Sequence, residues 1–348
     1  MTREKATDFN SLPMRIGTGQ FMAPTEERLK FIRQLGVRDI NLNLYQEQYT
    51  LEGLTYHTED EMPLEGKRGW AYEDLLELRE TVEAAGLRLT AIENVPLYFY
   101  DKIMLQREGY EEQLEHMKTT VRNIGRAGIP IFGYHWMPDG VQRTGTSDEL
   151  VRGGAKAGYF DEDEFEHEDR YDREYTESEL WEYYEEFLRE ILPVAEEAGV
   201  RLALHPNDPP IESVHGVPQL FRNLESFEKA MELVPSDHHG VELCLGCFSE
   251  MGEDPAEAIR TLGGENIFYV HFRDVQGTAT SFHEDWVDEG QYDEYEVMKA
   301  LYDSGFSGMM IPDHVPHLEG DSEWNHSGRA YTIGYLRGVL GCVERNAR

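Results

Sequence analysis

The sequence predicts a single (β/α)8 barrel. Eight short runs of β-branched or apolar residues alternate with eight longer stretches of helical, amphipathic spacing. Several of the runs begin just after a glycine of the kind that ends a helix. The 348 residues suffice for one large core, and no Pro/Gly/Ser-rich linker divides them. We therefore expect one domain over residues 1–348.

The expected strands have the length and apolar character of buried parallel strands. They occupy residues 14–19, 37–44, 87–95, 130–136, 201–206, 240–246, 267–274 and 308–314. Helix-ending glycines lie just before five of them, at Gly36, Gly86, Gly128, Gly199 and Gly305.

The expected helices are marked by apolar residues at helical spacing and, in the first, by Thr25 followed by two acidic residues, a typical N-terminal cap. They occupy residues 25–32, 72–85, 114–127, 181–198, 220–234, 255–262, 295–303 and 331–345. An open doubly wound sheet is the alternative architecture. It would usually carry a glycine-rich phosphate loop after the first strand, and Gly17 and Gly19 lack the third glycine and the acidic partner.

One connection, residues 138–176 after the fourth strand, is too long for an ordinary loop. It is glycine-rich at first and then strongly acidic, with scattered aromatic residues. Loops of this length inside a domain are usually functional lids or disordered segments. We expect an insertion that acts as a lid over the catalytic face of the barrel.

The charge excludes two classes of partner. With 68 acidic and 32 basic residues the net charge is −36, which repels nucleic acid and anionic membranes. The acidic residues are spread over nearly every expected helix rather than gathered in a tail, and this favours a halophilic protein. An anionic substrate would need local cations to draw it in.

Targeting signals and a disulfide framework are not expected. No run of 18 apolar residues could span a membrane, and the first ten residues do not resemble a signal peptide. Three cysteines are few and odd in number, which favours the reducing cytoplasm. We also expect a homo-oligomer, taken as a dimer.

A metal site is predicted at the ends of the last four strands. His205, Cys244, His271 and Asp313 each lie at or just after the end of one of these strands. Strand ends converge on one mouth of a barrel, so the four side chains could meet there. Two imidazoles, a thiolate and a carboxylate suit a borderline divalent ion, with Mn²⁺, Zn²⁺, Fe²⁺, Co²⁺ or Ni²⁺ all open.

Each residue alone has a plainer interpretation. A single cysteine in a strand is most often a small buried hydrophobe, and a single histidine is more often structural than a ligand. The joint placement of four ligand types at four consecutive strand ends favours the metal site.

Further polar residues share the expected mouth. His135 ends the fourth strand, and His314 and His317 lie next to Asp313. Arg143 and Arg273 offer the paired donors that a substrate carboxylate needs, although salt bridges to the acidic surface would explain either one.

The order of several motifs resembles the mannonate dehydratases. The chain carries HPNDPP, ELCLG, FYVHFR, SFHE, a G-x-x-D-x-YEV segment and PDH-x-x-H. Members of the family carry HPDDPP, a Cys-Thr-Gly turn, HLR, FHE, G-x-x-D-x-YEV and RPDHGH in the same order. The similarity covers about residues 70 to 340.

This resemblance implies a metal-dependent dehydration of D-mannonate to 2-keto-3-deoxy-D-gluconate. It implies that His205, Cys244, His271 and Asp313 bind the metal, typically Mn²⁺, and that His314 and Tyr331 are catalytic. His135, Arg143, Asn207, Arg273 and His317 are the expected substrate-binding residues. The chemistry needs a base for the C2 proton, a Lewis acid for the enediolate and an acid for the departing C3 hydroxyl.

The chain also departs from the family pattern. The first strand reads Arg-Ile-Gly-Thr-Gly where the family has Trp-Tyr-Gly, Asn207 replaces an aspartate, and His135 replaces an asparagine. Two alternatives therefore stay open: a sugar isomerase or epimerase of the xylose-isomerase-like barrels, and a non-catalytic protein that binds a sugar acid or a metal. Cys244 argues against the isomerases, whose sites are usually built from Glu, Asp and His.

Overall fold

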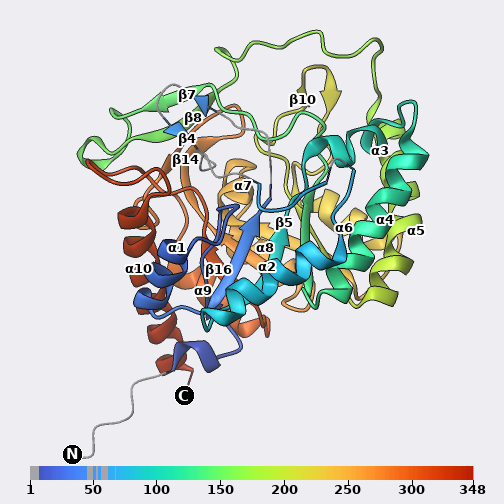
Figure 1. Ribbon diagram of the computed structural model, residues 1–348. Coiled ribbons are helices and arrows are strands. Elements are labelled where there is room, and N and C mark those ends of the chain that lie inside the picture. The colour runs from blue at the N-terminus through green and yellow to red at the C-terminus, as the bar shows by residue number, and fades with distance from the viewer. Residues whose placement is uncertain (1–7, 45–49, 52–53, 56–61, 67, 348) are drawn as a thin grey trace, which may run out of the picture.

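A parallel eight-stranded sheet forms the centre of the protein in a computed structural model that describes residues 8–44, 50–51, 54–55, 62–66 and 68–347 (Figure 1). The strand order is β1-β16-β13-β12-β9-β6-β5-β2. The strands are β1 (Arg15–Ile16), β2 (Asp39–Asn43), β5 (Arg88–Glu93), β6 (Ile131–His135), β9 (Arg201–His205), β12 (His239–Cys244), β13 (Ile267–Phe272) and β16 (Met309–Pro312). A parallel bridge from Thr18, just beyond β1, to Ile40 in β2 joins the two edges. The sheet thus closes, and the predicted barrel is confirmed.

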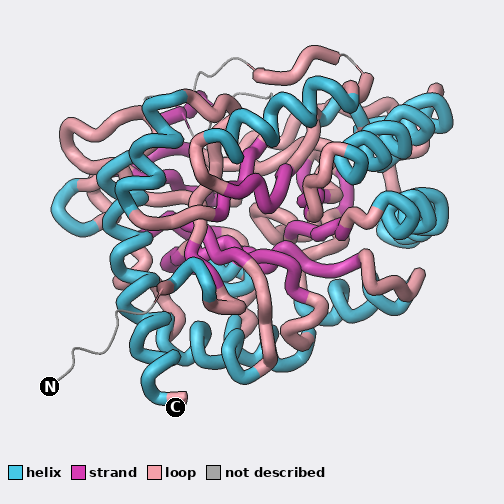
Figure 2. The backbone as a smooth tube through the Cα atoms, turned by 60° about the horizontal axis from the view of Figure 1, so that its bottom comes forward, coloured by secondary structure: helices cyan, strands magenta, loops and turns pink. Residues whose placement is uncertain are grey.

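Eight helices cover the outside of the sheet. Figure 2 shows helices around the central strands. They are α1 (Glu26–Leu35), α2 (Tyr72–Ala84), α4 (Tyr110–Arg126), α5 (Glu177–Ala198), α6 (Leu224–Leu233), α8 (Pro255–Leu262), α9 (Glu294–Asp303) and α10 (His326–Asn346). All eight predicted helices are present. Two short helices were not predicted, α3 (Asp101–Leu105) and α7 (Leu245–Glu250), because five or six residues are too few to display a helical period.

The helix ends follow local chemistry. The Thr25 side chain accepts a hydrogen bond from the Arg28 amide, as predicted, and Gly36 ends α1 with a left-handed φ of 74°. Thr176 caps α5 with a reciprocal capping box to Glu179, and the helix begins at Glu177, four residues before its expected start. The last helix starts at His326 instead of residue 331, because its polar first turn hides the helical period.

Part of the insertion after β6 joins a second sheet. Its strands β7 (Gly145–Ser147) and β8 (Ala157–Asp161) join β14 (Asp274–Thr278) and β15 (Ser281–Asp285), a hairpin that follows β13, in the order β14-β15-β8-β7. A small apolar cluster joins this sheet to the hairpin of β10 (Ser213–Val214) and β11 (Val217–Pro218), and it contains Phe160, Ile211, Val214, Val275 and Phe282. The remaining short strands are β3 (Thr50–Leu51) and β4 (Leu54–Thr55). The insertion therefore has an ordered framework at the carboxyl end of the barrel, while its function as a moving lid stays a prediction.

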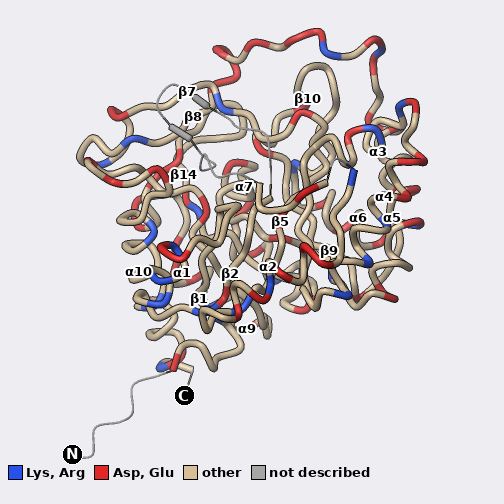
Figure 3. The backbone as a smooth tube through the Cα atoms, in the orientation of Figure 1, with Lys and Arg blue, Asp and Glu red and all other residues tan. Residues whose placement is uncertain are grey.

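Acidic residues are distributed along most of the described chain rather than gathered in one segment (Figure 3). Among the described residues no helix is both long enough and apolar enough to cross a membrane.

Candidate metal centre and active site

The four predicted metal ligands lie at the carboxyl ends of adjacent barrel strands. His205 and Cys244 are the last residues of β9 and β12, and His271 is next to last in β13. Asp313 follows β16 directly. Cys244 and His271 are register partners in the sheet, so their side chains leave neighbouring strands at the same height.

The tertiary structure brings these four side chains together. The ligand atoms of Cys244, His271 and Asp313 lie within 4.8 Å of one another, and those of His205, Cys244 and Cys247 do so as well. His271 Nδ1 lies 3.4 Å from Oδ2 of Asp313. The four predicted residues thus lie in one cluster, and Cys247 and Glu242, which were not predicted, lie in it as well.

The chemistry of the cluster fits a divalent ion. Nδ1 of His205 lies 2.7 Å from the carbonyl oxygen of Pro206 and donates to it, so Nε2 carries the lone pair of the neutral ring. Nδ1 of His271 is buried and has no hydrogen-bond partner among the described residues. Burial by itself would raise the pKa of Cys244, but hydrogen bonds from Cys247 and the charge of Arg273 lower it well below its usual value. A thiolate at this position is the form that binds metal.

A buried ionic network lies beside the cluster. Arg143 makes a paired contact with the two oxygens of Asp208, at 2.6 and 2.9 Å, and its Nη2 lies 2.5 Å from Oε1 of Glu284. Arg273 Nη1 lies 2.8 Å from Asp208 Oδ2, and the same guanidinium also contacts Glu250. Both arginines are therefore already paired with buried carboxylates.

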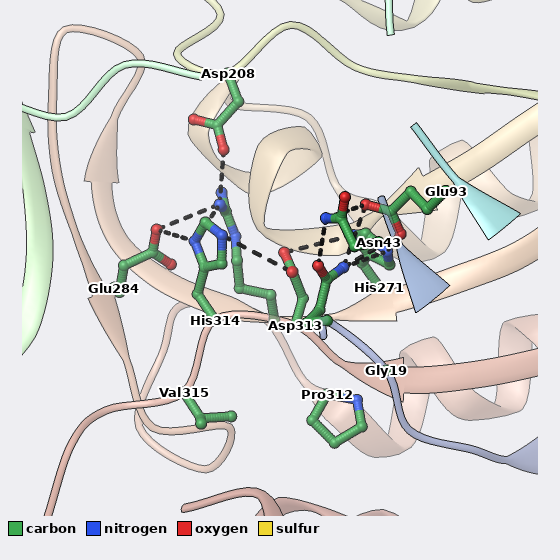
Figure 4. Close-up of polar contacts among 12 residues, drawn as sticks. Gly19, Asn43, Glu93, Asp208, His271, Glu284, Pro312, Asp313, His314 and Val315 are labelled. Carbon is green, nitrogen blue, oxygen red and sulfur yellow. Dashed lines mark hydrogen bonds and ion pairs between the residues drawn. The ribbon is translucent and has the colours of Figure 1, made fainter. Parts of the chain in front are cut away.

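His314 connects this network to the metal cluster. Its Nδ1 lies 2.7 Å from Oε1 of Glu284, and its Nε2 lies 3.8 Å from Oδ1 of Asp313. Burial would raise the pKa of Glu284, but the charges of Arg273, His314 and Arg143 lower it, so this carboxylate is ionised. In Figure 4, Glu284 and His314 lie on one side of Asp313, and Glu93 and His271 lie on the other. A histidine oriented by a carboxylate beside a set of metal ligands is an arrangement for moving protons.

Comparisons with known proteins identify the family of this chain. A family model described as D-mannonate dehydratase matches residues 29–176 and 163–348. The mannonate dehydratase of Streptococcus pneumoniae (strain 70585) is 31% identical over 313 residues, which cover 80% of this chain and 85% of the relative. This chain belongs to the mannonate dehydratase family.

A further relative and a solved structure support the same family. Mannonate dehydratase 2 of Halalkalibacterium halodurans is 29% identical over 307 residues, covering 79% of this chain and 88% of the relative. The crystal structure of the mannonate dehydratase from Streptococcus suis serotype 2 superposes with a TM-score of 0.84 at 28% identity, covering 96% of this chain and 94% of that one. An L-ribulose 3-epimerase matches with a TM-score of 0.60 at 15% identity, which shows a shared fold alone. The chain is thus a hydro-lyase on a xylose-isomerase-like barrel.

The cavity of this dehydratase lies at the barrel mouth, among the proposed ligands and His314. Of the predicted substrate-binding residues, His135 and Arg143 line it, together with three predicted ligands and His314. His317 lines a neighbouring cavity that shares His314 and Asp313, and β8 of the insertion contributes to its wall.

Three predicted site residues lie elsewhere. Asn207 is fully buried, and its side chain bonds to Gln219 and the Phe221 amide, so it supports a loop. Arg273 is 1% exposed, lines neither cavity and is surrounded by the buried carboxylates.

Tyr331 is the third of these residues. It is 41% exposed on α10 and donates a 2.7 Å hydrogen bond to Asp288. The structure does not bring its hydroxyl to the cavity. Its position in the sequence was assigned by family order, and the polar start of α10 made that alignment inexact.

Several polar residues that line the cavity or contact its ligands were not predicted from the sequence. They are Gln20, Asn43, Glu93, Asn94, Asp208, Glu242 and Glu284. Asn43 and Glu93 interrupt apolar runs at the ends of the second and third strands, and this interruption is their signal in the sequence. Asp208 is the neighbour of Asn207 in HPNDPP. Glu284 is the glutamate of the SFHE motif, but it lies on a hairpin that has no periodic pattern.

Proposed function

We propose that this enzyme dehydrates a sugar acid, with D-mannonate the first candidate, to give 2-keto-3-deoxy-D-gluconate and water in hexuronate catabolism. The observation that carries the proposal is the convergence of His205, Cys244, His271 and Asp313 next to the His314–Glu284 pair. A chain of this family that places a ligand set and an oriented histidine at one barrel mouth has the parts that the reaction needs.

The metal centre of the proposal consists of the four strand-end residues. Mn²⁺ is the proposed ion, and Fe²⁺, Co²⁺, Ni²⁺ and Zn²⁺ suit the same mixed donor set. A bound ion of this kind supplies a Lewis acid for the carboxylate end of the substrate, where negative charge grows when the C2 proton leaves.

His314 is the proposed proton-transfer residue. Because Nδ1–H is donated to Glu284, the neutral ring carries its lone pair on Nε2. This nitrogen accepts the C2 proton, and Glu284 stabilises the imidazolium that forms. Burial lowers the pKa of His135 to about 3, so that this side chain of the cavity wall stays neutral and can hydrogen-bond to sugar hydroxyls.

Arg143 is the proposed substrate-binding cation. It lines the cavity, and its contacts with Asp208 and Glu284 hold the guanidinium in place and share its charge. Arg273 is better assigned to holding the same carboxylates from behind. We further propose a homo-oligomer, as the sequence analysis expected.

A direct assay tests the proposal. The purified enzyme, with Mn²⁺ added, would be given D-mannonate and other C5 and C6 aldonic acids, and formation of the 2-keto-3-deoxy acid would be followed. We expect the highest kcat/KM with D-mannonate. A higher kcat/KM for another aldonate would refute the substrate, and interconversion of an aldose and a ketose without keto acid would refute the reaction class.

A further inference from the structure

We propose that Glu93 is a positioning residue of the metal centre. It accepts the Nε2 proton of His271 and so fixes the tautomer in which Nδ1 presents its lone pair towards Cys244 and Asp313. The inference rests on the proposed metal centre and adds to it a residue that contacts one of the proposed ligands.

The contacts of His271 decide between its two neutral tautomers. Nε2 lies 2.9 Å from Oε2 of Glu93 and 3.1 Å from Oε1 of Glu242, both buried carboxyl groups. Nδ1, by contrast, lies 3.4 Å from its nearest described carboxylate and makes no hydrogen bond. A lone pair on Nε2 would face the ionised Glu93 oxygen at hydrogen-bond distance, which is repulsive. A proton on Nε2 turns that contact into a hydrogen bond.

Glu93 is itself held in place by side-chain amides. Asn41 Nδ2 lies 2.5 Å from its Oε2, and Asn43 Nδ2 lies 3.1 Å from its Oε1. The Gln20 amide nitrogen lies 3.2 Å from Oε2 and 3.3 Å from Nε2 of His271. Because the Gln20 oxygen accepts from Asn43, its amide group is oriented with the nitrogen towards Glu93. These donors favour the ionised carboxylate and leave it little freedom to turn away from His271.

Glu242 is the second carboxyl group near the same nitrogen. Its carboxyl group is fully buried, and Nε2 of His205 also lies 4.0 Å from its Oε1. No amide of the described residues anchors it as Asn41 and Asn43 anchor Glu93, and neither of its oxygens has a well-aligned donor. Its contribution to the orientation of His271 is therefore expected to be the smaller of the two.

The arrangement is the carboxylate–histidine–metal triad in outline. An acceptor behind the imidazole fixes the ring, sets which nitrogen faces the metal and makes that nitrogen more basic. Loss of such an acceptor typically weakens metal affinity by about 10- to 100-fold. Glu93 lies at the end of a barrel strand that contributes none of the four proposed ligands, so its effect would act through His271.

The test compares isosteric substitutions. The Mn²⁺ dissociation constant would be measured by chelator competition for the wild type, Glu93→Gln, Glu242→Gln and His271→Ala. Asp39→Asn is the matched control. Asp39 is a fully buried carboxylate at the start of β2, and among the described residues its side chain bonds to Arg15, Arg88 and Thr90 and to none of the proposed ligands. Side-chain ¹⁵N NMR of the metal-free protein would report the His271 tautomer, a property that a loss of stability alone does not change.

We expect Glu93→Gln to weaken Mn²⁺ binding by about 10- to 100-fold and to lower the Nε2–H population of His271, with a smaller loss in Glu242→Gln and none in Asp39→Asn. Unchanged affinity in Glu93→Gln together with a large loss in His271→Ala would overturn the role of Glu93 and leave the proposed function intact. Unchanged affinity in His271→Ala would instead refute the metal centre on which both rest.

Discussion

Nδ1 of His314, in the loop after β16, lies 2.7 Å from Oε1 of Glu284 in β15. This contact makes Glu284 the residue that sets which nitrogen of His314 can accept a proton. Replacing Glu284 by Gln permits the other tautomer, since an amide can also donate to Nδ1. We expect kcat to fall by about 10²- to 10⁴-fold, as for the loss of a general base, with a smaller change in KM. Steady-state kinetics alongside a melting curve would measure this, and a kcat near that of the wild type would contradict the proton-transfer role.

His314 and Tyr331 can be compared directly. His314→Ala removes the proposed base and is expected to cost about 10²- to 10⁴-fold in kcat. Tyr331→Phe removes only an exposed hydrogen bond to Asp288, so kcat should stay within about twofold of the wild type. A hundredfold loss in Tyr331→Phe would restore the catalytic role implied by family resemblance. It would also mean that α10 or the insertion moves when substrate binds.

The three cysteines should differ sharply. Cys244→Ala removes a thiolate that lies with His271 and Asp313 within 4.8 Å, so Mn²⁺ binding and turnover should fall by orders of magnitude while the fold persists. Cys247→Ala should keep most of the metal affinity, and the exposed Cys342 should be neutral on replacement. Metal content of the purified variants, measured by mass spectrometry, would decide. Loss of metal in Cys247→Ala but not in Cys244→Ala would move the site to the start of α7.

Stability should fall in acid through two buried histidines. Burial lowers the pKa of both His135 and His239 to about 3, from a usual 6.5. Between pH 6.5 and pH 3 the unfolded chain binds these protons and the folded protein does not. Each histidine therefore contributes stability that is present above pH 6.5 and lost towards pH 3, by about 1.4 kcal/mol per pH unit. The free energy of unfolding, measured with urea at several pH values in this range, should fall less steeply with decreasing pH in His239→Gln than in the wild type. The same pH dependence in both proteins would refute the role of His239.

Salt should stabilise the protein. A net charge of −36 spread over the surface repels itself, and molar salt screens that repulsion. We expect the melting temperature to rise from low to molar KCl. A flat melting temperature over this range would contradict a halophilic surface.

The parts that the sequence predicted are those with a repeating or positional signal. Alternation of apolar runs and amphipathic stretches gave the barrel, because each element must bury one face against its neighbours. The strand-end positions of His205, Cys244, His271 and Asp313 gave the ligand cluster, because closure of a barrel carries all strand ends to one mouth. Family order then pointed to His314, which lies in the cavity, and to Tyr331, which does not.

Tertiary structure alone decided what each polar side chain faces. Arg273 was predicted to bind substrate, and in the structure it lies in a buried ionic network. Its partners Asp208, Glu250 and Glu284 come from three other segments of the chain. The partners of His271 and His314 are likewise distant in sequence, at Glu93 and Glu284. Periodicity in the sequence indicates which face of a helix or strand is buried. A hydrogen bond between side chains of two distant segments depends on the register of the strands, on closure of the barrel and on the position of the second sheet. The sequence by itself therefore determined the barrel and the strand ends at which the proposed site lies. The packed structure determined which carboxylates contact His271 and His314.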